Sequence, residues 1–441
     1  MVLEELEMVN ERHDLSAWAS VSKEWQSFFE PQNFHHLQIS YPGSDVDYLD
    51  HIINSHRRNY IRKVSLHVVL EEYDSTHGFD QPEITDTIRA NNKLFSQALK
   101  QLFNSLSAWI DRSSTGGIEL ELSASSPSDE HHPRSHRVLA AGHDLSRVIS
   151  LNSKRRLLGN LLDLSSGKLK LDQVSIVSHL SVTRHCYRSM SRTALAKILS
   201  SLCRLQTISY EPWRAVGPWD RGHLKREEAM IMLFECVSKS ATVKEVSLWE
   251  AQSCMHKNPS FPRFANAALV SSAVNASYNL QGFTQFDAVN ANDFFRHASM
   301  DEPGNPTGLP NSLRIWPALQ YLGLTMQIGD QVSLPSSLEC LLLEASRAAL
   351  RMPLLEAMEI VAPGDGEGFA FSFKVGRDSA LLTVVSTWQL ALSRKVVRSW
   401  RSVASRCAQR EFAFENRVVN MKSPNRAKGA LRLMRLLRER R

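Results

Sequence analysis

Five short segments in the second half of the chain share the form apolar-x-x-apolar, with a mostly apolar residue two positions further on. They begin at Leu205, Val243, Leu280, Leu319 and Leu355, so successive copies start 38, 37, 39 and 36 residues apart. This is the strand pattern of a leucine-rich repeat. A unit of one strand and one helix cannot bury its own apolar face, so stacked neighbours must bury it for each other. The spacing therefore predicts parallel, adjacent strands in one sheet, with the helices on the opposite, convex side.

The repeat is irregular, because its period exceeds the 20–29 residues of typical leucine-rich repeats. Apolar stripes at helical spacing precede most of the copies, which indicates one helix before each strand. The copy at Leu280 is the weakest, since it has Gln285 where the others have an apolar residue. We expect this copy to depart from the common sheet.

The rest of the chain adds strands and helices of the same kind. Alternating apolar residues predict strands at 63–70, 118–122 and 174–182, with Val64, Leu66 and Val68 on one face. A stripe over 92–110 predicts a long amphipathic helix. Strands at 369–375 and 381–388 are expected to pair across a Gly-Arg-Asp turn. The fold class is therefore α/β.

The N-terminal region contains an apolar stripe over residues 15–29, formed by Leu15, Trp18, Val21, Trp25, Phe28 and Phe29. This spacing predicts one face of a helix, with Asp14 as its N-cap. An ordinary amphipathic helix with a tryptophan in the core explains the spacing equally well. The identity of the residues in Val21-Ser-Lys-Glu-Trp25 favours a more specific interpretation.

That segment resembles the F-box, a short three-helix module that docks a protein onto a cullin-type ubiquitin ligase. Residues 31–37 resemble the exit of the module. Further segments are similar, in the same order, to a family of fungal F-box-like proteins with a leucine-rich-repeat-like domain. These segments are 64–122, Ser126-Pro-Ser-Asp129, Tyr210-Glu-Pro-Trp-Arg214, 348–355, and Ser386-Thr-Trp388 with Trp400.

The resemblance implies an F-box-like helical segment over 1–40, a solenoid over 60–404 and a basic C-terminal tail over 405–441. It also implies that the protein is the substrate-recognition subunit of a Skp–cullin–F-box ubiquitin ligase and catalyses nothing itself. The Skp-family adaptor would bind the N-terminal helices, and an unknown protein substrate would bind the solenoid. The residues that match apolar F-box positions are Leu3, Leu6, Leu15, Val21 and Trp25.

Two alternatives stay open. The Leu-Pro-x-Glu-Ile that usually opens an F-box is missing before Leu3, so the F-box is expected to be incomplete at its start. The chain would then be a solenoid interaction scaffold that no longer joins a ligase. An enzyme is disfavoured, because no phosphate-binding loop, nucleophile elbow, His-Glu-x-x-His or kinase signature occurs. No cofactor is expected.

The solenoid pattern also predicts which residues face a partner. Residues between the inward apolar positions lie on the concave surface, and they are small and polar without a clustered acid–base pair. Glu211-Pro-Trp-Arg214 has either a structural role at the core edge or a recognition role, since tryptophan and arginine are frequent in binding hot spots. The candidate substrate-binding residues are Thr207, Ser209, Trp213, Arg214, Glu245, Tyr321 and Glu359.

Composition excludes several classes of site and places the charge. Six cysteines lie far apart without ligand spacing, and His131-His132 beside Asp129 and Glu130 are interpreted as a solvated loop, so we expect no metal and no disulfide scaffold. No apolar run is long enough for a membrane span. Residues 417–441 hold nine Lys or Arg and one Glu, so this segment has a net charge of +8. The whole chain has a net charge of +6, so the rest of the chain has a net charge of −2. Two interpretations of this tail stay open, with a solvated basic segment favoured over a nuclear-localisation or polyanion-binding segment, so the tail is the one candidate for binding nucleic acid. The location is expected to be cytoplasmic, nuclear or both.

Overall fold

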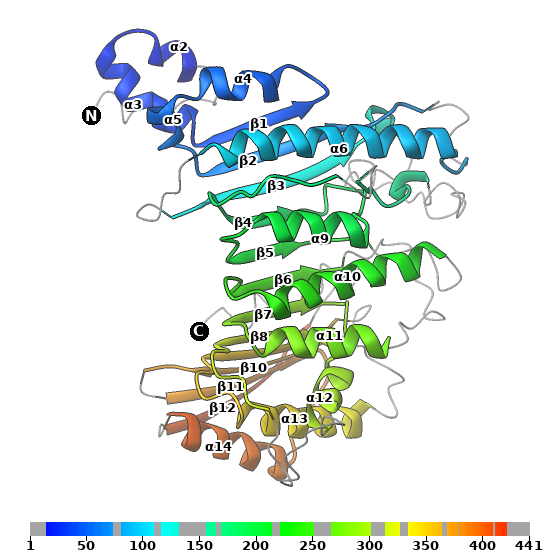
Figure 1. Cartoon of the computed structure of the whole chain (residues 1–441). Helices are drawn as coiled ribbons and strands as arrows, with labels where there is room; N and C mark the ends of the chain where they lie inside the picture. Colours follow the sequence, from blue (N-terminus) through cyan, green and yellow to red (C-terminus); the bar gives the residue numbers. More distant parts are fainter. Residues whose placement is uncertain are drawn as a thin grey trace, which may run out of the picture. The chain divides into compact units, whose positions relative to one another are not determined.

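The structure is a computed structural model of the whole chain, and its elements are labelled in Figure 1. It describes residues 15–73, 81–109, 116–131, 156–164, 169–213, 221–250, 266–300, 314–326, 334–363, 368–377, 379–408 and 411–420. The chain is mixed α/β and divides into two compact units, Met1–Tyr210 and Glu211–Arg441.

The first unit is built on five described strands that pair in parallel in chain order. They are β1 (His36–Tyr41), β2 (Lys63–Val69), β3 (Ile118–Ser125), β4 (Val177–Val182) and β5 (Thr207–Tyr210). Two short helices, α2 (Leu15–Ala19) and α3 (Lys23–Asn33), precede β1. The connections contain α4 (Asp45–Ile52), α5 (Ser55–Arg58), α6 (Thr85–Ser107), the 3-10 helix η2 (Pro127–His131) and α9 (Arg192–Ser201). In Figure 1, α4, α6 and α9 lie over one face of these strands.

The second unit contains seven described strands. Four of them, β6 (Glu245–Trp249), β7 (Gly282–Phe286), β8 (Tyr321–Thr325) and β9 (Ala357–Pro363), pair in parallel in chain order. Then β10 (Gly368–Val375) pairs antiparallel with both β9 and β11 (Ser379–Ser386), and β12 (Glu411–Val418) runs parallel to β11. The helices are α10 (Arg221–Lys239), α11 (Ala267–Ser277), α12 (Ala291–Ser299), α13 (Leu334–Ala349) and α14 (Arg394–Ala408).

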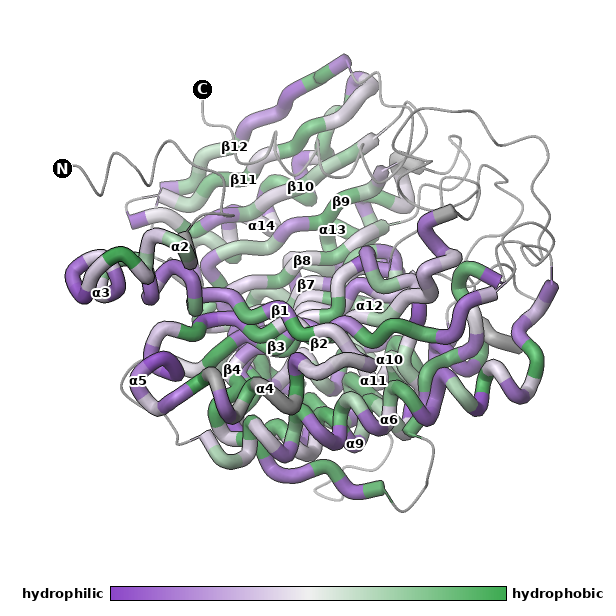
Figure 2. The backbone as a smooth tube through the Cα atoms, turned by 90° about the horizontal axis from the view of Figure 1, so that it is seen from above, coloured by the Kyte–Doolittle hydropathy of each residue, from purple (hydrophilic) through white to green (hydrophobic). Residues whose placement is uncertain are grey.

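Alternation along the strands explains why helices cover one face. In β2, Val64, Leu66 and Val68 are buried, while Lys63, Ser65 and the residues that alternate with them are half-buried. The buried set shares its face with Ile118, Leu120 and Leu122 of β3. Because residues i and i+2 share a face of a strand, α6 covers one apolar face and leaves the polar one uncovered by any described helix. Figure 2 shows the hydropathy of each residue along the backbone, with purple, hydrophilic residues in α5 and green, hydrophobic residues within β9–β11.

Four of the predicted repeat strands are confirmed within the second unit. The segments that begin at Val243, Leu280, Leu319 and Leu355 contain β6, β7, β8 and β9, which are adjacent and parallel. The segment at Leu205 contains β5, which pairs with β4 in the first unit. The predicted hairpin of β10 and β11 is also confirmed.

The expectation that the Leu280 copy would fail is wrong. Gln285 is buried in β7, in register with Leu248 of β6. Its amide binds both backbone groups of Val289: Oε1 accepts from the Val289 N–H at 2.7 Å, and Nε2 donates to the Val289 carbonyl. A buried glutamine is compatible with this core position, because its amide oxygen and nitrogen both form hydrogen bonds with the backbone of the following turn.

Two boundaries differ from the sequence prediction. The single helix expected over 15–29 is two helices, because Ser22 is extended and its Oγ accepts from the Trp25 N–H at 3.3 Å, which starts α3. The predicted N-cap Asp14 lies outside the described residues. The segment after 405 is not only a tail: α14 extends to Ala408, and the alternating residues of 411–418 form β12. Residues 421–441 lie outside the described part.

Candidate functional site

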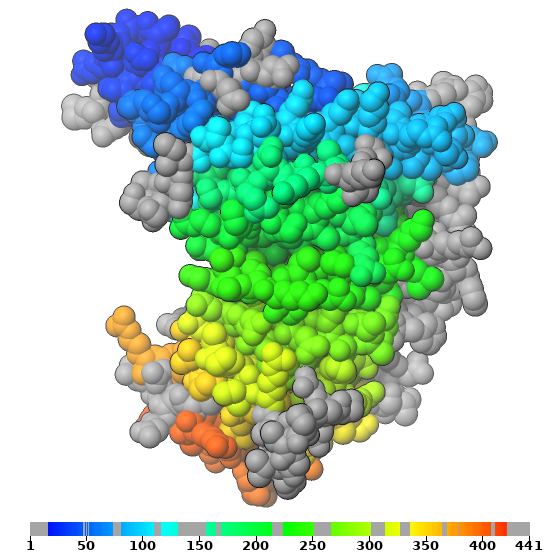
Figure 3. Space-filling view, in the orientation of Figure 1, coloured from blue at the N-terminus to red at the C-terminus, as the bar shows by residue number. Residues whose placement is uncertain are grey.

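An aromatic cluster holds α2 and α3 together. Phe29 is fully buried, and its ring centroid lies 5.2 Å from that of Trp18, 5.8 Å from that of Trp25 and 4.9 Å from that of Phe28. The other three rings are only half-buried. Figure 3 shows the atoms of α2 and α3, in dark blue, on the surface of the first unit. The two helices therefore present aromatic surface to the outside.

The predicted adaptor-binding residues lie at different places in and around this cluster. Val21 lies in the turn between the helices with 63% of its surface exposed, and Trp25 is half-buried on α3. Leu15 begins α2, and its side chain is not among those described. Leu3 and Leu6 lie outside the described residues. Val21 and Trp25, which lie four residues apart around the start of α3, thus both keep accessible surface.

An ion pair fixes α3 against α5. Arg57 donates to Oε1 of Glu30 from Nη2 at 2.7 Å and from Nε at 3.1 Å, and Gln26 donates to the same oxygen at 2.9 Å. Burial alone would raise the pKa of Glu30, but these hydrogen bonds and the charges of Arg57 and His56 hold it below its ordinary value. The charged Glu30 therefore links α3 to Arg57 of α5.

The uncovered face of the first unit carries a hydrogen-bonded polar network. Lys63 of β2 lies between two carboxylates of β3, with its Nζ 3.0 Å from Glu119 Oε1 and 2.5 Å from Glu121 Oε2. Burial alone would lower the pKa of Lys63, but the hydrogen bonds and charges of Glu121 and Glu119 raise it. On the same face the ring of His67 bonds the hydroxyls of Ser123 and Ser125 at 2.9 and 3.1 Å, and burial lowers its pKa.

Sequence analysis missed this network, although the candidates Thr207 and Ser209 lie at its margin. The register places Thr207 beside His179 and Ser209 beside Ser181, on the polar side of β4 and β5. Both candidates are half-buried. The charged residues of the network lie on β2 and β3. The alternation of polar and apolar residues in Lys63-Val-Ser-Leu-His67 and Glu119-Leu-Glu121 indicates that these polar side chains share one face of the sheet.

The candidates of the second unit form a row of mixed accessibility. Glu245 is exposed and lies in register with Gly282, which lies in register with Tyr321. Tyr321 donates its hydroxyl to Glu359 Oε2 at 2.8 Å, and Lys374 Nζ lies 3.2 Å from Oε1. Glu359 is buried. Both carboxylate oxygens of Glu359 therefore already have partners within the second unit, Tyr321 and Lys374.

The structure describes one of the two candidates of the Glu211–Arg214 motif. Trp213 is buried, which agrees with the structural alternative at the core edge. Arg214 lies outside the described residues. A stacked pair in the second unit was missed instead: Trp249 lies parallel to Phe286 with centroids 3.9 Å apart, and both pack against the buried Val361, Ala370 and Val385.

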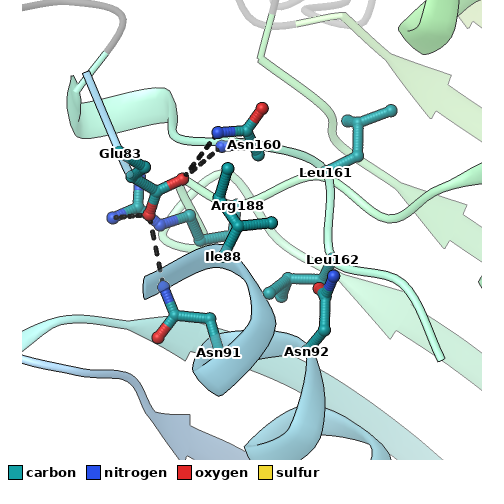
Figure 4. Close-up of a pocket in the computed structure, with 8 residues that line it drawn as sticks. All are labelled: Glu83, Ile88, Asn91, Asn92, Asn160, Leu161, Leu162 and Arg188. Carbon is teal, nitrogen blue, oxygen red and sulfur yellow. Dashed lines mark hydrogen bonds and ion pairs between the residues drawn. The ribbon is translucent and has the colours of Figure 1, made fainter. Parts of the chain in front are cut away.

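The most charged buried site is a cluster around Arg188 in the first unit. Its guanidinium donates to the Arg156 carbonyl at 2.8 Å, and its Nη2 lies 3.7 Å from Glu83 and 3.6 Å from Asp129. Asn91 and Asn160 bind Glu83 in turn, as the dashed lines of Figure 4 show. All three charged side chains are at most 4% exposed.

This cluster corrects the interpretation of Asp129 as part of a solvated loop. Asp129 accepts from the Tyr73 hydroxyl at 2.9 Å and from the Ser126 N–H at 2.8 Å. Burial raises the pKa of Asp129, and the charge of Arg188 opposes that rise. Burial, together with the charge of Asp129, also raises the pKa of Tyr73.

The recess beside the cluster is small. It has about 180 Å³ of empty space with open solvent included and is lined by Glu83, Asn92 and Arg188 among others (Figure 4). The ion pairs and hydrogen bonds of Arg188 join the segment before α6, η2 and the segment after β4.

The described residues hold no group of three or more His, Cys, Asp or Glu side chains placed to bind a metal ion. Within that same part of the chain, no helix has the length and hydrophobicity to cross a bilayer.

Comparison with known proteins adds one similarity. Residues 233–439, a little under half of the chain, match the model of a family of unknown function, DUF6546. The match begins in α10 and runs through β12, so it falls within the second unit. No curated protein matches the chain.

Proposed function

We propose that this protein is the substrate-recognition subunit of a Skp–cullin–F-box ubiquitin ligase. Its N-terminal helices bind the Skp-family adaptor, each of its two α/β units is irregular and leucine-rich-repeat-like, and the strand residues that no described helix covers bind a protein substrate. The chain itself catalyses nothing. The observation that carries the proposal is the accessible apolar surface that Val21 and Trp25 keep around the start of α3, in the segment that resembles an F-box.

The N-terminal geometry supports a docking role. An exposed valine in a tight turn, flanked by half-buried tryptophans, has no part in the core of the first unit. Aromatic side chains with one accessible face are frequent anchors of protein interfaces. The Arg57–Glu30 ion pair links α3 to α5, so docking an adaptor would cost little ordering of this segment.

The sheets support a substrate-binding role. The first unit has a helix-covered apolar face and a face of polar residues such as Lys63 and Glu121, and Glu245 is exposed in the first strand of the second unit. Parallel strands with helices between them are the arrangement of repeat proteins, which use their extended strand face for binding. The mixed charges of Lys63, Glu119 and Glu121 suit a polar peptide or protein surface.

Replacing Val21 with aspartate tests the adaptor hypothesis. The side chain is mostly exposed, so the change should alter stability by less than about 0.5 kcal/mol, while a charge in the centre of an apolar contact should reduce adaptor binding at least about tenfold. The measurement is co-purification of the Skp-family adaptor with the tagged full chain, followed by titration of purified components.

A matched control is Leu354→Asp, since Leu354 is an exposed aliphatic residue far along the sequence from α2 and α3. The proposal predicts normal adaptor recovery with this variant. Equal recovery by wild type, Val21→Asp and Leu354→Asp would show that the adaptor does not use this surface. If the wild type does not bind the adaptor, the ligase proposal is wrong, and the alternative of an interaction scaffold that joins no ligase is favoured.

A further inference from the structure

The last strand of the second unit has one edge that no described strand occupies. β12 pairs with β11 in the register Ser386–Val418, and the Val419 N–H donates to the Ser386 carbonyl at 2.9 Å. In a parallel ladder this geometry directs the backbone groups of the odd-numbered residues 411–417 toward β11. The N–H and C=O groups of the even-numbered residues therefore point away from β11. These residues are Phe412, Phe414, Asn416 and Val418.

The side chains of β12 are also unusually accessible. Phe414 is 38% exposed and Val418 58% exposed, on the face where Arg401 of α14 lies over the ring of Phe412. Unpaired edge strands with apolar side chains are sites of strand addition, and proteins usually protect them with charges, prolines or bulges. The described β12 has no proline and no register shift, and its only charged residues are Glu411, Glu415 and Arg417.

We propose that β12 pairs antiparallel with β12 of a second copy of this chain and so forms a two-fold symmetric dimer. In such a dimer, the residues whose backbone N–H and C=O groups point away from β11 must lie opposite one another, because the two residues of a hydrogen-bonded antiparallel pair exchange N–H···O bonds. A pairing centred on Phe414 meets this condition. It sets Phe414 opposite the same residue of the second copy, Phe412 opposite Asn416, and Glu411 opposite Arg417.

Charge selects this register over its neighbours. A shift of two residues in either direction keeps the backbone pattern, but it sets Glu415 opposite itself or opposite Glu411, and like charges directly opposite are destabilising. A shift of four residues sets Glu415 opposite Arg417 but leaves Glu411 and the next two residues without partners. The register centred on Phe414 pairs all but one residue of β12 and gives two symmetry-related Glu411–Arg417 contacts. Arg417 already pairs with Glu415 of its own strand, so each contact adds a second carboxylate to a guanidinium that has one.

The contact is small. One pair of eight-residue strands buries less than the roughly 1,600 Å² of a standard protein interface. We therefore expect weak association that depends on concentration, and sedimentation velocity of the purified full chain over a wide concentration range is the suitable measurement. The average mass of the wild type should rise toward that of a dimer.

Charge exchange tests both the partner and the register. Glu411→Arg sets arginine opposite arginine, and Arg417→Glu sets glutamate opposite glutamate, so each variant alone should dimerise about tenfold more weakly. An equimolar mixture of the two variants restores both opposite-charge pairs, so the mixture should associate about as strongly as the wild type. Glu411 is exposed, and circular dichroism of each variant checks that the fold is retained.

Three outcomes would overturn the proposal. One is a wild type that stays monomeric throughout the concentration range. Another is a dimer whose strength neither variant changes. The third is a mixture that associates no better than the separate variants, which would show that Glu411 and Arg417 do not face each other.

Discussion

Replacing Arg188 with methionine should lower the free energy of unfolding by about 3–5 kcal/mol, because it leaves the carboxylates of Glu83 and Asp129 buried without their positive partner. Methionine has a similar length, so the loss comes mainly from charge and from the hydrogen bond to the Arg156 carbonyl. The measurement is chemical denaturation of the full chain at neutral pH, followed through the first unit. The control is Arg89→Met, whose ion pair with Asp86 is exposed and should contribute less than about 1 kcal/mol.

The same variant should become relatively more stable in acid. In the wild type, burial raises the pKa of Asp129 above 3.8 while the charge of Arg188 opposes the rise. Without Arg188 the folded pKa rises further, so the folded state binds a proton that the unfolded state releases. Between 3.8 and the raised folded pKa, stability then increases as pH falls. A difference between wild type and Arg188→Met that stays constant or grows on acidification would contradict this account of the cluster.

Replacing Gly159 with alanine should destabilise the first unit by about 3 kcal/mol or more, through a left-handed backbone cost and a clash. Gly159 has φ +56°, and a Cβ there would lie 2.3 Å from Nη1 and 2.7 Å from Cζ of Arg188. Arg188 is held by Glu83, Asp129 and two carbonyls, so it cannot move aside without breaking the cluster.

Gly116→Ala is the matched control for this prediction. Gly116 has φ +77°, but a Cβ there would meet nothing within 4 Å. Gly116→Ala should therefore lower the free energy of unfolding only by the strain of a left-handed backbone, about 1–2 kcal/mol. Equal effects of the two substitutions in thermal or chemical denaturation would show that Arg188 does not require the glycine.

The strands were the part of the fold that sequence could predict, because their signal is local. Val64, Leu66 and Val68 alternate within one segment, and the copies at Val243, Leu319 and Leu355 repeat one pattern. Burial of one sheet face requires such patterns wherever a strand forms. β12 was missed because its alternation in 411–418 was read as part of a basic tail.

Long-range polar contacts were not predictable in this way. Arg188 and Asp129 are 59 residues apart in sequence, and no spacing indicates that Glu83 and Gly159 meet them. The Lys63–Glu119–Glu121 network depends on the register of β2 and β3, which the alternation alone leaves open. Gln285 looked like a defect because its partner, the backbone of Val289, carries no side-chain signal.

Hydrogen–deuterium exchange of the full chain with and without a purified Skp-family adaptor tests the proposed function most directly. The proposal predicts slower amide exchange in residues 15–33 when the adaptor is present, since binding should close off α2, α3 and the Val21 turn between them. Exchange in β7–β9 should stay unchanged in the same samples. Unchanged exchange in residues 15–33 at saturating adaptor, or protection only in another segment, would contradict the role of these helices.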